Sequence, residues 1–192
     1  GALPHLVADP VLTMAHSITA LQSIISRNVS PLATAVISTT QVQAGSAVNI
    51  IPDECRFSGT IRTFDPEIRQ QVLDRVEAIV GGTAATLGCT ARVEFELMSL
   101  PVINDEDVAA RVGAHAAQVL PGLIYHQDFR TMAAEDMAYF LAKVPGIFML
   151  VGSANAARKL HYPHHHPSFD FDEDALLTGM ILMAASVAEF VL

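Results

Sequence analysis

Apolar positions in the first half of the chain repeat with helical and strand-like spacing in turn. Asp9-Pro10 and Asp65-Pro66 each predict a helix start, because Asp can cap free backbone N–H groups and Pro suits the first helical position. Apolar side chains follow each start at helical intervals, and Gly88 is expected to end the second helix. Strands are predicted at residues 34–43, 54–63 and 91–97.

The order helix–strand–strand–helix–strand is one strand short of the split βαβ unit of ferredoxin-like folds. Two helices over three strands leave an unpaired strand edge or an uncovered apolar strip, and either favours pairing with another chain. We therefore predict an α+β domain at residues 1–100 that lacks its first strand and self-associates. The missing strand would precede Gly1, which predicts a truncated chain.

The pattern changes near residues 98–104, where we place a domain boundary. Residues 101–192 are predicted to be a fragment of an α/β domain that needs a partner sheet, because so few strands cannot form a complete layer. A continuous apolar run at 147–152 is typical of a strand buried on both faces. The elements predicted for this half are helices at 105–120, 135–143 and 173–192 and strands at 123–127 and 147–152.

The last predicted helix is apolar on nearly all sides. Thr178, Gly179 and Ser186 interrupt it, so its continuous apolar stretch is shorter than the roughly 20 residues that span a bilayer. We interpret it as a buried core helix rather than a membrane anchor.

Composition narrows the functional classes further. The chain is 51% hydrophobic and 16% charged, and its formal net charge of -9 argues against nucleic acid as a partner. No basic run favours a membrane surface. Cys55 and Cys89 both lie in strand-like segments, which predicts reduced, buried thiols. The chain does not open with a signal-peptide pattern, so we predict a cytoplasmic location.

Four of the 8 histidines fall between His161 and His166. Neutral imidazole is a common metal ligand whose second nitrogen needs an orienting acceptor, and Asp170 and Asp172 are close enough in sequence to supply one. The same composition is compatible with a solvated loop or with a metal-sequestering loop on an inert scaffold. The residues alone leave these readings open.

Five segments, in order, resemble the motifs of the M20 metallopeptidases, in the branch of hippurate and indole-acetyl-amino-acid hydrolases. The resemblance extends over essentially the whole chain and corresponds to the second half of a family member. The segments are Gly1–His5 with Asp9-Pro10, Asn49–Glu54, Gly59–Phe64, Ala134–Phe140 and His165–Phe171.

The resemblance implies a lid or dimerisation domain at residues 1–100 and the C-terminal part of a catalytic α/β domain at 101–192. It places a ligand of a two-metal site, zinc or manganese, on His165, and contacts to the substrate carboxylate on Asn49 and Arg62. It also places Glu135-Asp136 near the site. The other metal ligands and the general base belong to the family's first half, so no catalytic residue is assigned here.

The implied reaction is hydrolysis of N-acyl amino acids or small peptide-like amides by a homodimer. We expect this chain alone to be inactive. A different class stays open, in which it is a non-catalytic dimerising or small-ligand-binding module.

Overall fold

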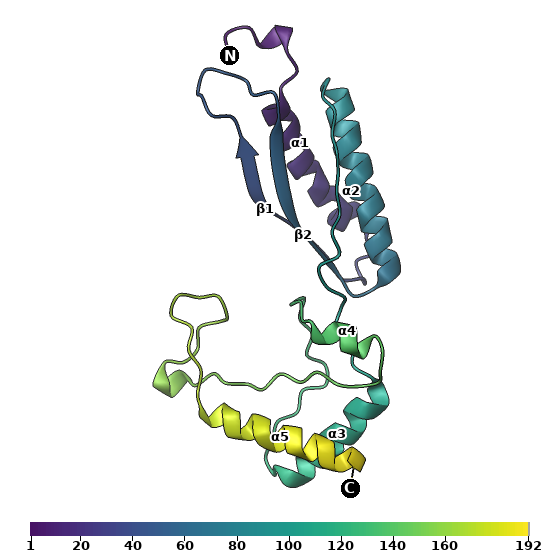
Figure 1. The fold of residues 1–192 in the computed structure, drawn as a ribbon, viewed down its shortest axis with the longest axis vertical. Helices are drawn as coiled ribbons and strands as arrows, with labels where there is room; N and C mark the ends of the chain where they lie inside the picture. Colours follow the sequence, from purple (N-terminus) through teal and green to yellow (C-terminus); the bar gives the residue numbers. More distant parts are fainter. Residues whose placement is uncertain (192) are drawn as a thin grey trace. The chain divides into compact units, whose positions relative to one another are not determined.

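A computed structural model describes residues 1–191, and the chain divides into two compact units, Gly1–Pro101 and Val102–Leu192 (Figure 1). Both units mix helix with extended chain. The regular strands that the structure describes belong to the first unit.

The first unit is built from α1 (Pro10–Ser23), a π-helical turn (Ile24–Asn28), β1 (Ala35–Ala44), β2 (Cys55–Thr63) and α2 (Pro66–Thr86). Both predicted helix starts are confirmed. The Asp9 carboxylate accepts hydrogen bonds from the backbone of Val11 and Leu12, and Asp65 caps α2 in the same way. Gly88 follows α2 with a φ of 76°, a conformation that favours glycine and ends the helix.

Strands β1 and β2 form an antiparallel pair whose register runs from Ala35 opposite Thr63 to Ala44 opposite Cys55. The register shifts between Thr39 and Gln41, which marks a β-bulge. Gly59 lies beside the bulge, where a Cβ atom would collide with the backbone oxygen of Ser38. The hairpin needs glycine there because the two backbones approach so closely.

Helices α1 and α2 lie side by side against the β1–β2 hairpin (Figure 1). Their facing apolar stripes create the core, and Phe57 and Ile61 of β2 pack against it, as their shared strand face predicts. The buried residues of this core are Leu21, Ile24, Val29, Val72, Val76 and Val80.

The strand predicted at 91–97 is wrong. This segment is extended but belongs to no strand pair, because the described sheet contains β1 and β2 alone. Val93 packs against the core, whereas Phe95 and Leu97 are 44% and 49% exposed. Alternating side chains therefore favour extended backbone, but a strand also needs a neighbouring strand for its hydrogen bonds.

The second unit contains α3 (Glu106–Val119), α4 (Met137–Leu141), a 3₁₀ turn (Ala156–Arg158) and α5 (Asp174–Val191). The three predicted helices are confirmed in position, although α4 is shorter than expected. Helices α3 and α5 are joined by Arg111, whose Nε lies 3.0 Å from the Glu189 carboxylate and whose guanidinium lies 4.1 Å from the Phe190 ring centre.

The strands predicted at 123–127 and 147–152 are also wrong. The second unit holds one isolated β-bridge within its described residues, between Asn155 and Leu160. In the second segment, the Asn104 side chain takes the place of a strand neighbour, because it bonds both the N–H and the C=O of Phe148. An apolar run indicates a segment that can be buried, but it becomes a strand only where a neighbouring strand is present to pair with it.

Helix α5 is much more exposed than a core helix. Leu182 and Ala185 are its buried residues in the described chain, while Leu177 and Met183 are 60% and 67% exposed. The prediction that this chain buries the helix is wrong. By length and composition alone α5 could cross a membrane, and it is the one helix within residues 1–191 for which that holds.

Candidate functional site

The histidine loop is anchored at its C-terminal end by Asp172, a carboxylate that is only 8% exposed. It accepts hydrogen bonds from the Asn155 amide at 2.5 Å, from Arg158 Nη1 at 2.6 Å and from the backbone N–H of Asp174 at 3.2 Å. These donors hold the pKa of the Asp172 carboxyl below its ordinary value, and the hydrogen bond from the Asn155 amide has the largest effect. Asp172 is therefore an ionised anchor that ties the chain before the loop to the start of α5.

Sequence analysis did not single out Asn155 or Arg158. Asn before a short helical turn is a capping signal, and the Asn155 side chain does accept from the backbone of Arg158 at 3.2 Å. Their link to Asp172 is long-range, so no local pattern announces it.

Between these anchors, the backbone reverses at a turn in which the His166 N–H donates to the Pro163 carbonyl oxygen at 3.2 Å. His165 occupies the turn with a φ of 68°, in the left-handed region that glycine adopts far more readily. Holding a non-glycine residue there costs about 1–3 kcal/mol, and such positions cluster at functional sites.

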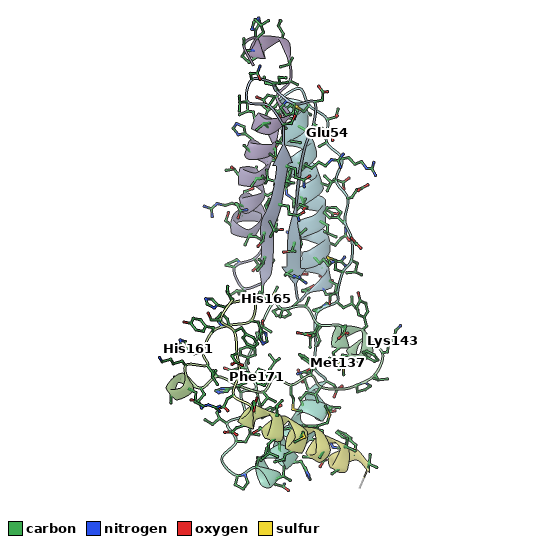
Figure 2. All side chains as sticks on the ribbon, turned by 60° about the vertical axis from the view of Figure 1, so that its left-hand side comes forward. Glu54, Met137, Lys143, His161, His165 and Phe171 are labelled. Carbon is green, nitrogen blue, oxygen red and sulfur yellow. The ribbon has the colours of Figure 1, made fainter. Side chains whose placement is uncertain are left out.

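His165 also differs from its neighbours in its ring contacts. It is exposed, and among residues 1–191 its ring has no stacking, ion-pair or hydrogen-bonding partner. Its place on the loop is marked in Figure 2. The other rings are packed: His161 on Tyr162 (centroids 4.7 Å apart), His166 on Tyr162 (4.2 Å), and His164 against Phe169 (4.7 Å).

The carboxylates proposed as acceptors for an imidazole are engaged elsewhere. Asp170 accepts the backbone N–H of Phe171 at 2.8 Å, and Asp172 is occupied by Asn155, Arg158 and Asp174. Neither carboxylate contacts a histidine ring. That expectation from sequence proximity is wrong, because the ordered backbone turns the two side chains to other donors.

The residues of this chain do not complete a metal site. Within residues 1–191, no three His, Cys, Asp or Glu side chains converge well enough to hold an ion. A single imidazole provides little affinity, and bound metals in proteins generally have several converging ligands. No chemical step through a metal can be derived from these side chains alone.

Arg62 lies near the end of β2, on the face opposite Phe57 and Ile61 and therefore away from the helices. Its side chain is half-buried and has no ion-pair or hydrogen-bond partner in the described part of the chain. A free guanidinium on an uncovered sheet face can take a planar, bidentate anion such as a carboxylate.

Asn49 lies in the loop between β1 and β2, at the opposite end of the hairpin from Arg62. The loop backbone passes close to Gly1, where an added Cβ atom would lie 2.6 Å from the Asn49 oxygen. Arg62 lies seven positions along β2 from Cys55, a span of about 23 Å at a rise of about 3.3 Å per residue, and Asn49 lies in the loop that precedes Cys55. One chain therefore does not bring these two residues together.

Comparison with known proteins finds similarity to peptidases and deacetylases. Residues 1–86 match the family described as "Peptidase dimerisation domain". N-acetyl-L-cysteine deacetylase of Bacillus subtilis is 36% identical over 188 residues, which are 97% of this chain and 43% of that protein. N-acetyldiaminopimelate deacetylase of Halalkalibacterium halodurans is 34% identical over 92% of this chain and 46% of its own length.

A solved structure gives the same result. The Bacillus subtilis YXEP protein, described as a dinuclear metal-binding peptidase from the M20 family, superposes with a TM-score of 0.75 at 31% identity. The match covers 96% of this chain and 46% of that one, so the chain spans about half the length of the relatives it matches. From its ordered motifs, its first unit and these relatives, the chain belongs to the M20 peptidase family.

Proposed function

We propose that this chain is part of a metal-dependent amidohydrolase that cleaves N-acyl amino acids or small peptide-like amides. Residues 1–100 serve as its lid and dimerisation domain, and residues 101–192 are the C-terminal part of its catalytic domain. The relatives named N-acetyl-L-cysteine deacetylase and N-acetyldiaminopimelate deacetylase support the substrate class, and the dinuclear M20 structure supports a divalent-metal parent. We place the parent enzyme in the cytoplasm.

The observation that carries this proposal is the state of His165. It is the one histidine of the loop whose ring has no stacking or hydrogen-bonding partner within the described chain, and its backbone has a positive φ, which is uncommon for a residue other than glycine. Neither property helps the loop to fold. Both are accounted for if the ring is presented to a metal ion.

The rest of the site comes from outside this chain. The exposed apolar face of α5 and the lack of a converging ligand set among residues 1–191 both support a missing partner segment. The isolated chain is therefore inactive, because one imidazole of the loop cannot hold two ions.

Substrate binding requires a second copy of the chain. One small amide cannot reach both Asn49 and Arg62 in the same hairpin, because they lie at opposite ends of it. In a two-fold dimer, paired edge strands run antiparallel, so each hairpin end meets the opposite end of its partner. Arg62 of one copy and Asn49 of the other then hold the substrate carboxylate together.

A second candidate function is a non-catalytic module that dimerises or binds a small ligand. The incomplete ligand set of residues 1–191 favours it for the chain as it stands. Strand addition at the free edges of the hairpin is sufficient for self-association without any catalysis.

One experiment separates the two functions. Metal content by mass spectrometry and release of free amino acid from an N-acetyl amino acid are measured for this chain and for the full-length parent. We expect metal and turnover in the parent alone, and loss of most of both in its His165→Asn variant. His164→Asn is the matched control and should retain both.

Two results would contradict the proposal. Stoichiometric metal with turnover in this isolated chain would show that the site is built differently. Full metal occupancy and activity in His165→Asn would show that His165 is not a metal ligand.

A further inference from the structure

Two cysteines that are 34 positions apart in the sequence both place their sulfurs against the first turn of α1. Cys55 opens β2, and its Sγ donates to the Pro10 carbonyl oxygen at 3.0 Å. Cys89 follows α2, and its sulfur accepts a hydrogen bond from Thr13 Oγ1 at 3.3 Å. Pro10 and Thr13 are three residues apart on one helix, so they occupy neighbouring points of the same face. Both sulfurs therefore contact one helical turn.

The surroundings keep the two thiols close but unbonded. Both are free and only partly buried, so a small oxidant can reach them. Burial raises the pKa of the Cys55 thiol, and the nearby Cys89, Asp9 and Glu54 add to the rise through their negative charge. Cys55 is consequently protonated at neutral pH, in keeping with its hydrogen bond to Pro10.

Metal binding does not account for the pair. Within residues 1–191, neither cysteine belongs to a group of three side chains able to hold an ion. Packing accounts for it only in part, because each sulfur also has a specific hydrogen-bond partner. The sequence analysis predicted buried thiols in strands, but Cys89 lies outside any strand and both cysteines are only partly buried.

We infer that Cys55 and Cys89 form a reversible intramolecular disulfide when the protein meets hydrogen peroxide. The Cys89 thiolate attacks the peroxide O–O bond, which gives a sulfenic acid and, with one proton, water. The Cys55 sulfur then attacks the sulfenic sulfur, the S–O bond breaks, and the departing hydroxide takes the Cys55 proton to form a second water. Two thiols and one peroxide thus become one disulfide and two waters, and a dithiol reductant reverses the change.

The disulfide would join the start of β2 to the segment just after α2, around the first turn of α1. It would close a chain loop that contains most of the hairpin's second strand and the whole of α2. Closing a loop of this length restricts the unfolded chain, so the melting temperature should rise by roughly 10 °C. It would also fix the base of the loop that carries Asn49.

The test exposes this chain to hydrogen peroxide, blocks the remaining thiols and digests it for mass spectrometry. We expect a cross-linked peptide containing Cys55 and Cys89, lighter by two hydrogen atoms than the two separate peptides. We also expect the disulfide to form faster in the folded protein than in urea, because the fold holds the sulfurs together. Dithiothreitol should restore both thiols and the original melting temperature.

Cys55→Ser and Cys89→Ser are the matched controls, and neither should show a rise in melting temperature after peroxide. Three outcomes would overturn the inference. These are disulfides that join separate chains only, oxidation of each sulfur to sulfinic acid without a cross-link, and faster cross-linking in urea than in the folded state.

Discussion

The two units of this chain differ in how completely they bury their apolar side chains. The first encloses a continuous core between α1, α2 and the hairpin, with Ile24 and Val72 wholly inaccessible to solvent. The second buries only a few small or isolated apolar side chains, and it exposes a long series of large ones along α5 and the extended segments. The first unit therefore has a core of its own, whereas the second leaves exposed much of the apolar surface that would form a core.

This difference shows where stability resides in the chain. A buried apolar side chain contributes about 1.5–3 kcal/mol relative to an exposed one, and most such side chains lie in the first unit. The second unit depends more on individual polar links, such as Arg111 to Glu189 and Asp172 to Asn155. The units should therefore respond to different perturbations.

The largest expected effect comes from truncating the core of the first unit. Ile24→Ala should lower the free energy of unfolding by about 2–5 kcal/mol, because it removes a fully buried side chain from a tight cluster. Leu177→Ala on exposed α5 should change it by less than about 0.5 kcal/mol in this chain. Urea unfolding followed by circular dichroism measures both. Equal losses of unfolding free energy for the two substitutions would contradict the proposed difference between the units.

A somewhat smaller effect is expected at the bulge. Gly59→Ala places a methyl group against the backbone of Ser38 and should cost about 1–3 kcal/mol, as overpacking typically does. Gly152→Ala in the second unit meets nothing within 4 Å and should be tolerated. Thermal melts of both variants check this. An unchanged melting temperature for Gly59→Ala would show that the hairpin absorbs the extra group.

Acid should weaken the second unit through Asp172. The pKa of Asp172 is held below its ordinary value of 3.8, so its contribution to stability is present above that pH and is lost as the pH falls through the lower folded value. The chain has no Trp, and its 3 Tyr residues all lie in the second unit, so tyrosine fluorescence follows that unit alone. The signal should change below pH 4 in the wild type, and Asp172→Asn should show the same change already at neutral pH. A pH-independent signal would contradict the anchoring role.

The smallest expected effect concerns the strained turn. His165→Asn should leave stability unchanged or raise it by up to about 1 kcal/mol, because the short Asn side chain can hydrogen-bond locally in the left-handed region. His164→Asn, one residue earlier, should bring no such gain. Calorimetry of both variants provides the measurement. A loss of stability in His165→Asn would show that the ring supports the fold, against the proposed ligand role.

Sequence reasoning succeeded where the determining contacts are local and failed where they are not. The Asp-Pro signals located α1 and α2 because capping acts within three residues. The strand at 91–97 failed because its formation depends on a neighbouring strand, and residues 147–152 failed for the same reason. The ordered motifs led to the family. They did not predict the Asp172 anchor, which depends on contacts to residues 14 and 17 positions away, or the lack of ring partners at His165.

The Asn104 side chain has a further consequence for the apolar run at 147–152. Its Nδ2 donates a hydrogen bond to the Phe148 carbonyl oxygen at 3.1 Å, and its Oδ1 accepts one from the Phe148 N–H at 2.8 Å. The side chain thus mimics one peptide unit of an adjacent strand. Phe148 should then be an isolated point of slow amide hydrogen exchange within a run whose other N–H groups exchange quickly. If a sheet in the parent enzyme later pairs with this run, Asn104 marks the residue from which the pairing would extend.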